Sequence, residues 1–126
     1  MTKIAIHTPA APAAIGPYSQ AIKAGNTVYL SGQLGLIPET GTLPEGITAQ
    51  TKQAFDNIAA IAQEAGGSMN HIVKVTILLA DLADFAKVNA IMESRFEKPY
   101  PARATYQVAA LPKAALVEIE AVLVLP

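Results

Sequence analysis

The chain has 126 residues, which is enough for one domain with a single hydrophobic core and too few for two. Apolar residues make up 52% of it and charged residues 15%, against roughly 25% in typical soluble domains, so we expect part of the apolar surplus to cover a subunit interface. The net charge of −1 and the scattered lysines argue against a basic nucleic-acid or membrane surface, and the absence of cysteine excludes disulfides and thiolate catalysis.

The N-terminal segment has no continuous apolar stretch of the kind found in signal peptides, because Pro9 and Pro12 interrupt it. No apolar run approaches the roughly 18 residues that a membrane span requires. The two histidines, His7 and His71, are too far apart in the sequence for a recognisable metal-binding motif. We therefore predict a cytoplasmic protein with a single domain over residues 1–126 that uses neither a metal nor a cofactor.

The first part of the chain predicts strands. Residues 1–8 are typical of a short strand or arm. The dipeptide Gly25-Asn26 lies between the β-prone runs 19–24 and 27–33. A two-residue Gly-Asn turn matches the twist of paired strands, so this pattern predicts a tight antiparallel hairpin.

A helix and a strand are predicted next. Thr48 is expected to be the helix N-cap, and Gly66-Gly67 is expected to end the helix. The stretch "HIVKVTILLA", residues 71–80, is apolar at most positions, which favours an interior strand. The apolar residues that recur at helical spacing are Phe55, Ile58, Ala62 and Ala65.

Asp81 is expected to cap a second helix, which Pro99 and Pro101 end. Two further strands, 103–110 and 116–125, are expected to form a hairpin joined by "LPKAA". The expected inner face of the helix consists of Phe85, Val88, Asn89, Met92 and Phe96.

These elements predict an α+β fold of order ββαβαββ, with two helices on one face of a mostly antiparallel sheet. A helix covers a sheet by burying its apolar stripe against one face. No third helix is available for the opposite face, so subunit association is the simplest way to cover it.

The last strand combines charge with apolar surroundings. Glu118 and Glu120 share one face of a strand built otherwise from Leu, Val, Ile and Ala, and Arg103 lies one short connection earlier. Charges in apolar surroundings are costly unless they are paired, hydrogen-bonded or used in chemistry. Arg103 could form a structural ion pair with either glutamate, or its guanidinium could bind a carboxylate ligand while one glutamate acts as a general base on water.

The sequence leaves the register of the last two strands open. One register of the expected hairpin places Arg103 diagonal to Glu118, at roughly 5–8 Å, and the other places the two side chains on opposite faces.

Four other residues have both a functional and a structural interpretation. In "IGPYSQA", Tyr18 follows a rigid Gly-Pro bend, which alone is more typical of a turn than of catalysis. In "LSGQLGL", Gly32 interrupts a strand pattern, which indicates a bulge or a close approach to a ligand. Asn89 lies on the apolar face of the second helix, where a satisfied buried amide is the alternative. Arg95 is expected to be a solvated surface residue.

The motifs "IGPYSQA", "LSGQLGLIPETG", "DLADFAKVNA" and "PARATYQVAALPKAALVEIEA", with the element order, resemble the RidA (YjgF/L-PSP) family of reactive enamine and imine deaminases. The resemblance extends from about Pro12 to Val124. It implies a chorismate-mutase-like fold and homotrimers with ligand clefts between subunits. It also implies hydrolysis of 2-imino acids to 2-keto acids and ammonia without a metal or cofactor. The imines arise from enamines such as 2-aminoacrylate, which PLP-dependent serine/threonine dehydratases release.

The resemblance also implies a role for individual residues. Arg103 of "PAR" binds the substrate carboxylate, Glu118, the first acid of "EIE", activates water, and Tyr18 of "GPY" completes the catalytic group. Thr105 stands where the family often has cysteine, so we expect activity with an altered fit of the substrate. The positions expected to contact the substrate are Ser31, Gly32, Asn89 and Thr105.

Two other functions remain possible at this point. Some family members have been described as endoribonucleases or translation inhibitors, but a net charge of −1 argues against RNA as a ligand. The second alternative function is a non-catalytic trimer that binds small carboxylates or acts like a chaperone. The presence of both Arg103 and Glu118 favours the deaminase, while the preferred imine and the protected pathway stay open.

Overall fold

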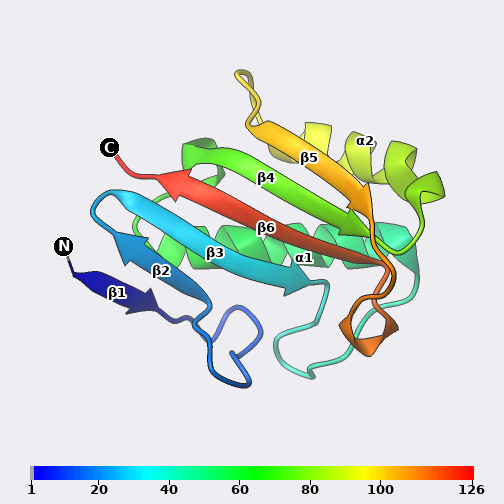
Figure 1. Cartoon of the computed structure of the whole chain (residues 1–126), viewed down its shortest axis with the longest axis horizontal. Coiled ribbons are helices and arrows are strands. Elements are labelled where there is room, and N and C mark those ends of the chain that lie inside the picture. Colours follow the sequence, from blue (N-terminus) through cyan, green and yellow to red (C-terminus); the bar gives the residue numbers. More distant parts are fainter. Residues whose placement is uncertain (1) are drawn as a thin grey trace.

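The computed structural model describes residues 2–126, which form a six-stranded mixed sheet with two α-helices against one face (Figure 1). The helices are α1, Gly46–Glu64, and α2, Phe85–Arg95. The strands are β1 Lys3–Ile6, β2 Ala21–Ala24, β3 Thr27–Leu34, β4 Ile72–Leu79, β5 Ala102–Gln107 and β6 Val117–Val124. They lie in the order β1-β2-β3-β6-β4-β5, and every neighbouring pair is antiparallel except β4 and β5. The predicted class, two helices on one face of a mostly antiparallel sheet, is confirmed.

The Gly25-Asn26 hairpin is confirmed. Ala24 pairs with Thr27 across the turn, and Gly25 adopts a positive φ of 63°, which a residue with a side chain rarely adopts. The N-terminal segment adds β1 alongside β2, so the expected short strand is present at one edge of the sheet.

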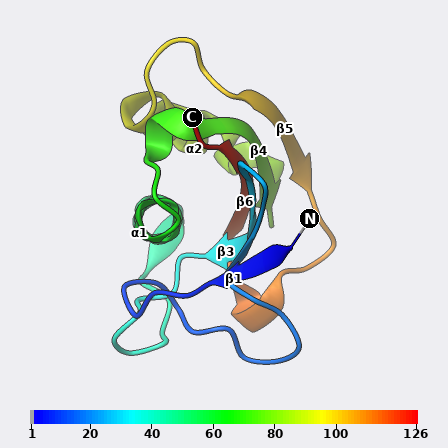
Figure 2. The ribbon, with the colours of Figure 1, turned by 90° about the vertical axis from the view of Figure 1, so that its left-hand side faces the viewer.

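The hydrophobic core lies between β6 and α1. Val117, Ile119 and Leu123 on β6 are fully buried, as are Phe55 and Ile61 on α1. Figure 2 shows the sheet curving around the helices, with α1 seen almost end-on. A strand with alternate residues fully buried belongs in the interior of a sheet, and β6 lies there, between β3 and β4.

The first helix begins two residues before the predicted cap, so Thr48 is not its N-cap. The chain enters the helix through Gly46, whose φ is +88°, and the N-cap residue Glu45 makes no side-chain capping bond. The predicted end is confirmed: the amide of Gly66 donates to Gln63 and that of Gly67 to Ala62, the two bonds of a Schellman motif.

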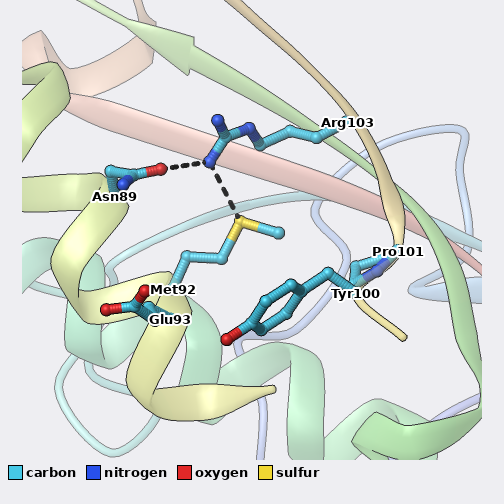
Figure 3. A pocket seen from close by; sticks show the side chains of 6 residues that line it. All are labelled: Asn89, Met92, Glu93, Tyr100, Pro101 and Arg103. Atoms are coloured by element: carbon cyan, nitrogen blue, oxygen red, sulfur yellow. Dashed lines mark hydrogen bonds between the residues drawn. The ribbon is translucent and has the colours of Figure 1, made fainter. Parts of the chain in front are cut away.

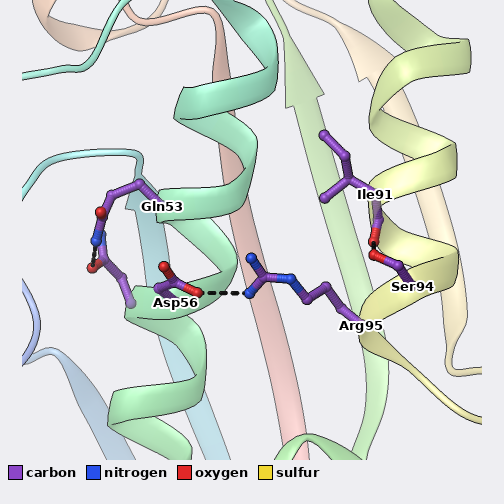
Figure 4. Close-up of polar contacts among 6 residues, drawn as sticks. Gln53, Asp56, Ile91, Ser94 and Arg95 are labelled. Atoms are coloured by element: carbon purple, nitrogen blue, oxygen red, sulfur yellow. Dashed lines mark hydrogen bonds and ion pairs between the residues drawn. The ribbon is translucent and has the colours of Figure 1, made fainter.

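The second helix is preceded by a short 3₁₀ turn, Leu82–Asp84, and Asp81 caps that turn by accepting a hydrogen bond from the Ala83 amide. The two α-helices are joined by an ion pair of 2.7 Å between Arg95 Nη1 and Asp56 Oδ1 (Figure 4). Arg95 is therefore a half-buried link between helices, and not the free, solvated residue that the sequence suggested.

The predicted hairpin of the last two strands is wrong. β5 pairs with β4 in parallel, and β6 pairs with β4 and β3. Both glutamates of β6 form cross-strand pairs with β4: Glu118 pairs with Leu78 and Glu120 with Thr76. The physical reason is burial: β6 carries the most apolar stripe and takes the interior position, while the largely exposed β5 forms the edge.

The connection from β5 to β6 contains an unusual turn, Pro112–Ala114. Lys113 has a φ of 58° and Ala114 a φ of 54°, so two consecutive residues with side chains adopt the left-handed conformation. Such conformations are unfavourable for residues other than glycine and persist where the surrounding structure imposes them.

The face of the sheet opposite the helices is uncovered, as the sequence led us to expect. Tyr29 and Tyr106 lie on this open face and are 55% and 56% exposed. A hollow of about 180 Å³ on it is lined by Tyr29, Leu30, Lys74, Thr76, Glu120, Ala121 and Val122.

Candidate functional site

Arg103 lies on the edge strand β5, and its side chain projects to the helix side of the sheet, because it pairs with Val75, which is buried against the helices. Its Nη1 donates to Asn89 Oδ1 at 2.6 Å and lies 3.7 Å from Met92 Sδ (Figure 3). Its Cζ is 5.2 Å from the centre of the Phe85 ring, a cation–π contact. All three partners belong to α2.

No carboxylate in residues 2–126 forms an ion pair with Arg103. The structural ion pair with Glu118 or Glu120, one of the two interpretations of the sequence, is therefore absent from the single chain. The guanidinium keeps its charge beside a cavity of about 320 Å³. This cavity is lined by Asn89, Met92, Glu93, Tyr100, Pro101 and Arg103 (Figure 3).

Glu118 lies on β6 and points to the open face of the sheet, where it is half-buried. It sits against Gly32, at a bulge between Leu30 and Gln33 where the register of β3 and β6 shifts. A methyl group at Gly32 would overlap the Glu118 carboxylate. The expected bulge is confirmed, and the lack of a side chain at Gly32 makes room for the carboxylate.

The electrostatic setting of Glu118 favours a proton acceptor. Burial raises the pKa of the Glu118 carboxyl above its usual range, and the negative charge of Glu120 on the same face raises it further. A carboxylate with a raised pKa is a stronger base than an ordinary one, and catalytic carboxylates are often tuned in this way.

A cavity of about 410 Å³ adjoins this carboxylate. Tyr18, Gly32 and Glu118 all reach it, and apolar side chains form most of its wall. Its lining comprises Pro12, Ala13, Ile15, Tyr18, Gln20, Gly32, Gln33, Leu34, Leu36, Pro112, Lys113 and Glu118. Tyr18 and Ser31 also line a second, more open hollow of about 410 Å³ next to it.

The loop that carries Tyr18 is held by Gln20, a residue to which the sequence analysis gave no role. Gln20 is buried, accepts from the Thr8 amide at 2.7 Å, and donates to the carbonyl of Pro12 at 2.8 Å. The Tyr18 hydroxyl oxygen accepts from the Ile15 amide at 3.3 Å, so its proton stays available to donate. A polar residue in an apolar strand pattern was the only signal that could have identified Gln20.

Ser31 and Thr105 are not placed as substrate contacts by the single chain. Ser31 Oγ donates to the Ser19 carbonyl at 2.5 Å, so it fixes the start of β2 to β3. Thr105 Oγ1 is buried and has no hydrogen-bond partner within residues 2–126. Thr105 pairs with Ile77 and shares the helix-facing side of β5 with Arg103.

The candidate residues form two separate groups in one chain. Arg103 and Asn89 lie on the helix side of the sheet, whereas Glu118, Tyr18 and Gly32 line a cavity that opens from the other face. The hairpin register that would have placed Arg103 beside Glu118 does not exist. One chain therefore presents an exposed arginine and a half-buried glutamate at two different places.

Within residues 2–126, no cluster of three or more His, Cys, Asp or Glu side chains has the geometry to hold a metal ion. None of the helices in that range is long and apolar enough to cross a membrane.

The comparisons with known proteins cover almost the whole chain. The family model described as endoribonuclease L-PSP matches residues 8–125. A mouse protein named 2-iminobutanoate/2-iminopropanoate deaminase is 52% identical over 120 residues, which are 94% of this chain and 89% of the mouse protein.

Two solved structures agree with the fold. The crystal structure of RidA from the Antarctic bacterium Psychrobacter is 56% identical and superposes with a TM-score of 0.95 over 97% of this chain and 99% of that one. The structure of E. coli TdcF with bound serine is 38% identical, with a TM-score of 0.91 over 98% and 99% of the two chains. The chain therefore belongs to the endoribonuclease L-PSP family, the family of the RidA and YjgF proteins.

Proposed function

We propose that this protein is a hydrolase that converts 2-imino acids to 2-keto acids and ammonia. The observation that carries the proposal is the combination of an Arg103 guanidinium without an ion-pair partner in residues 2–126 and a half-buried Glu118 carboxylate beside a cavity. Relatives named 2-iminobutanoate/2-iminopropanoate deaminase, which are 50–52% identical to this chain, support it. The substrates would be the small imines that follow enamine release by PLP-dependent dehydratases.

We further propose that the site is completed between the subunits of a homotrimer, in which the Arg103 group of one copy faces the Glu118 cavity of the next. Three features support this arrangement. Arg103 lies at the edge strand, the two groups occupy opposite faces of one sheet, and the open face is uncovered. A ring of identical copies joined head to tail brings two different surfaces together at each contact.

The reaction then follows from the chemistry of the two groups. The Arg103 guanidinium binds the substrate carboxylate through two parallel hydrogen bonds and fixes the imine carbon. Glu118 takes a proton from a water molecule as the water oxygen attacks the imine carbon, which gives a carbinolamine. The protonated Glu118 returns this proton to the nitrogen, which leaves as ammonia, and the carboxylate takes up the hydroxyl proton as the C–O bond becomes a carbonyl. Imine and water are thus converted to keto acid and ammonia without an oxidant or reductant.

Tyr18 and Asn89 have supporting roles in this proposal. The Tyr18 oxygen accepts from the main chain at Ile15, so its O–H can donate a hydrogen bond to the substrate. Asn89 holds Arg103 in place at 2.6 Å. Thr105, beside Arg103 on the same strand face, would adjoin the bound substrate once a second copy closes the cleft.

The test is a coupled assay. An amino-acid oxidase generates 2-iminobutanoate from 2-aminobutanoate, and semicarbazide traps the imine that remains. Catalytic amounts of this protein should lower the yield of trapped imine and raise the yield of 2-oxobutanoate, while Glu118→Gln protein at the same concentration should do neither. Wild-type protein that leaves the trapped imine unchanged would contradict the proposal.

The assay, together with a titration of 2-oxobutanoate, separates catalysis from simple binding. A protein that binds 2-oxobutanoate tightly but never lowers the trapped imine would be a non-catalytic carboxylate binder. Cleavage of RNA, the activity in the family's description, is disfavoured by the net charge of −1.

A further inference from the structure

We propose that Met92 and Phe85 are positioning residues, which act with Asn89 to fix the orientation of the Arg103 guanidinium. The inference rests on the proposed function, since it assigns a task to the side chains around the carboxylate-binding arginine. We call the three side chains from α2 the Arg103 cradle.

The Arg103 cradle is one stripe of a single helix. Positions 85, 89 and 92 are four and three residues apart, so their side chains are neighbours along one face of α2. Asn89 and Met92 contact Nη1 of Arg103 (Figure 3), and the Phe85 ring lies against its Cζ atom. The apolar pattern of this helix predicted core residues at these positions, but only Met92 is nearly buried, at 5% exposed, while Phe85 is 36% exposed.

Each contact in the cradle is electrically neutral. Asn89 offers an amide oxygen, Met92 a thioether sulfur and Phe85 the face of a ring. These groups hold a cation in place without cancelling its charge. A carboxylate at any of the three positions would pair with Arg103 and compete with the carboxylate of a ligand.

The cradle also determines which edge of the guanidinium can meet a ligand. A guanidinium has five N–H donors, and the two on Nη1 are directed to Asn89 and Met92. Within residues 2–126, Nε and Nη2 of Arg103 have no hydrogen-bond acceptor. A carboxylate needs two parallel donors, so the Nε–Nη2 edge is the one left for two-point binding.

A packing role alone would make different predictions. If Met92 only filled space, the volume-conserving change Met92→Leu would leave ligand binding as it is. If Sδ helps to hold Nη1, losing this acceptor lets the guanidinium rotate. Ligand binding must then restrict that rotation, and the lost conformational entropy weakens the affinity for the ligand. A positioning role therefore predicts weaker ligand binding in a variant whose stability is unchanged, whereas a packing role predicts no change in binding.

The first experiment compares Met92→Leu with Met69→Leu in the intact protein. Met69 lies in the short 3₁₀ turn Met69–His71, borders a different cavity and makes a matched control. Met92→Leu should raise the KM for 2-iminobutanoate and the Kd of the product 2-oxobutanoate about three- to tenfold, with kcat little changed. Met69→Leu should change neither. Met92→Gln, which restores an acceptor of similar length, should recover most of the lost affinity.

The second experiment shows whether Met92 acts through the guanidinium. In an Arg103→Lys background there is no fork to orient, so Met92→Leu should cause no further loss of kcat/KM. Phe85→Leu should show the same dependence on Arg103. Equal losses in both backgrounds, or an unchanged KM and Kd in Met92→Leu, would overturn the proposal.

The outcomes also separate this inference from the proposed function. A wild-type protein that deaminates imines, with a Met92→Leu variant indistinguishable from it, contradicts the cradle alone. A wild-type protein without deaminase activity contradicts the proposed function, and the cradle is then decided by the titrations with 2-oxobutanoate. Wild-type protein that neither deaminates imines nor binds 2-oxobutanoate contradicts both.

Discussion

The Arg103 group and the Glu118 cavity are built in opposite ways. Arg103 is an exposed cation at a sheet edge, held by three neutral side chains from one helix. Glu118 is a half-buried anion in the middle of the sheet, in a largely apolar cavity with a second carboxylate two residues away. Within residues 2–126 no carboxylate forms an ion pair with Arg103, whereas Glu118 is made more basic because its surroundings disfavour charge.

In our proposal, the contrast separates substrate binding from proton transfer within one small domain. If both groups faced each other in the same chain, they would form an ion pair, which would lower the basicity of the glutamate and occupy the arginine. On opposite faces they cannot do so within one chain. In our proposal they meet only with a substrate between them, so the carboxylate of the ligand, and not Glu118, pairs with Arg103.

The largest expected effects come from disabling each group in turn. Glu118→Gln is nearly isosteric but cannot take a proton, so kcat for 2-iminobutanoate should fall roughly 10²–10⁴-fold. The Kd of 2-oxobutanoate should stay the same or improve. Arg103→Lys keeps a charge but loses the planar fork, so kcat/KM and product binding should fall together. Steady-state kinetics and calorimetric titration measure both. Near wild-type turnover by Glu118→Gln would show that another residue is the base.

Mixing two inactive variants tests whether the two groups come from different subunits. In trimers reassembled from equal amounts of Arg103→Lys and Glu118→Gln chains, about a quarter of the sites should pair an intact arginine with an intact glutamate. Activity should then return to about a quarter of the wild-type value, from almost nothing in either variant alone. No recovery in verified mixed assemblies would place both groups in one subunit's site, and a stable monomer at micromolar concentration would rule out the trimer.

Gly32→Ala should damage the Glu118 group and spare the Arg103 group. The added methyl overlaps the Glu118 carboxylate, and a displaced base should cost roughly 10²-fold in kcat, with the Kd of 2-oxobutanoate little changed. The shorter acid in Glu118→Asp leaves room for that methyl group. Gly32→Ala should therefore cost much less in the Glu118→Asp background than in the wild type, and equal costs in both would refute the steric explanation.

The smallest expected effect concerns pH. Glu118 works as a base only when ionised, so the rate should fall as the pH decreases through its raised pKa. Glu120→Gln removes a neighbouring negative charge, lowers the pKa of Glu118 and should move this acid limb of the kcat profile to lower pH. Glu64→Gln, the same charge change at the far end of α1, serves as the control. A limb that stays in place, or moves equally in both variants, would show that Glu120 does not tune the base.

Features set by neighbouring residues could be predicted from the sequence. The Gly25-Asn26 turn and the Gly66 helix end need only local geometry, and both are confirmed. The pairing of β5 could not be predicted, because a parallel pair with β4 depends on contacts between segments far apart in the chain. The hairpin prediction was wrong, and it left open whether Arg103 and Glu118 share a face; the structure places them on opposite faces of the sheet.

The candidate site residues came from motif resemblance, and their roles stay predictions, whereas their relative placement had to come from the structure. The structure places Arg103 beside one cavity and Glu118, with its raised pKa, beside another. The contacts of Phe85 and Met92 with the guanidinium could not be predicted from the sequence. An apolar helix residue that contacts an arginine has the same spacing in the sequence as one that packs in the core. Gln20 was missed because a buried amide that holds a loop looks like any other polar residue in a strand.

The left-handed turn at Lys113 and Ala114 has a consequence for engineering. Each such residue costs on the order of 1 kcal/mol relative to a right-handed conformation, and glycine avoids most of that cost. Ala114→Gly would relieve this strain in the folded state, while the greater freedom of glycine in the unfolded chain offsets part of the gain, so we expect a small rise in Tm. Because Pro112 and Lys113 border the Glu118 cavity, a relaxed turn would also reshape that wall, and thermostability would be gained at some expense of turnover.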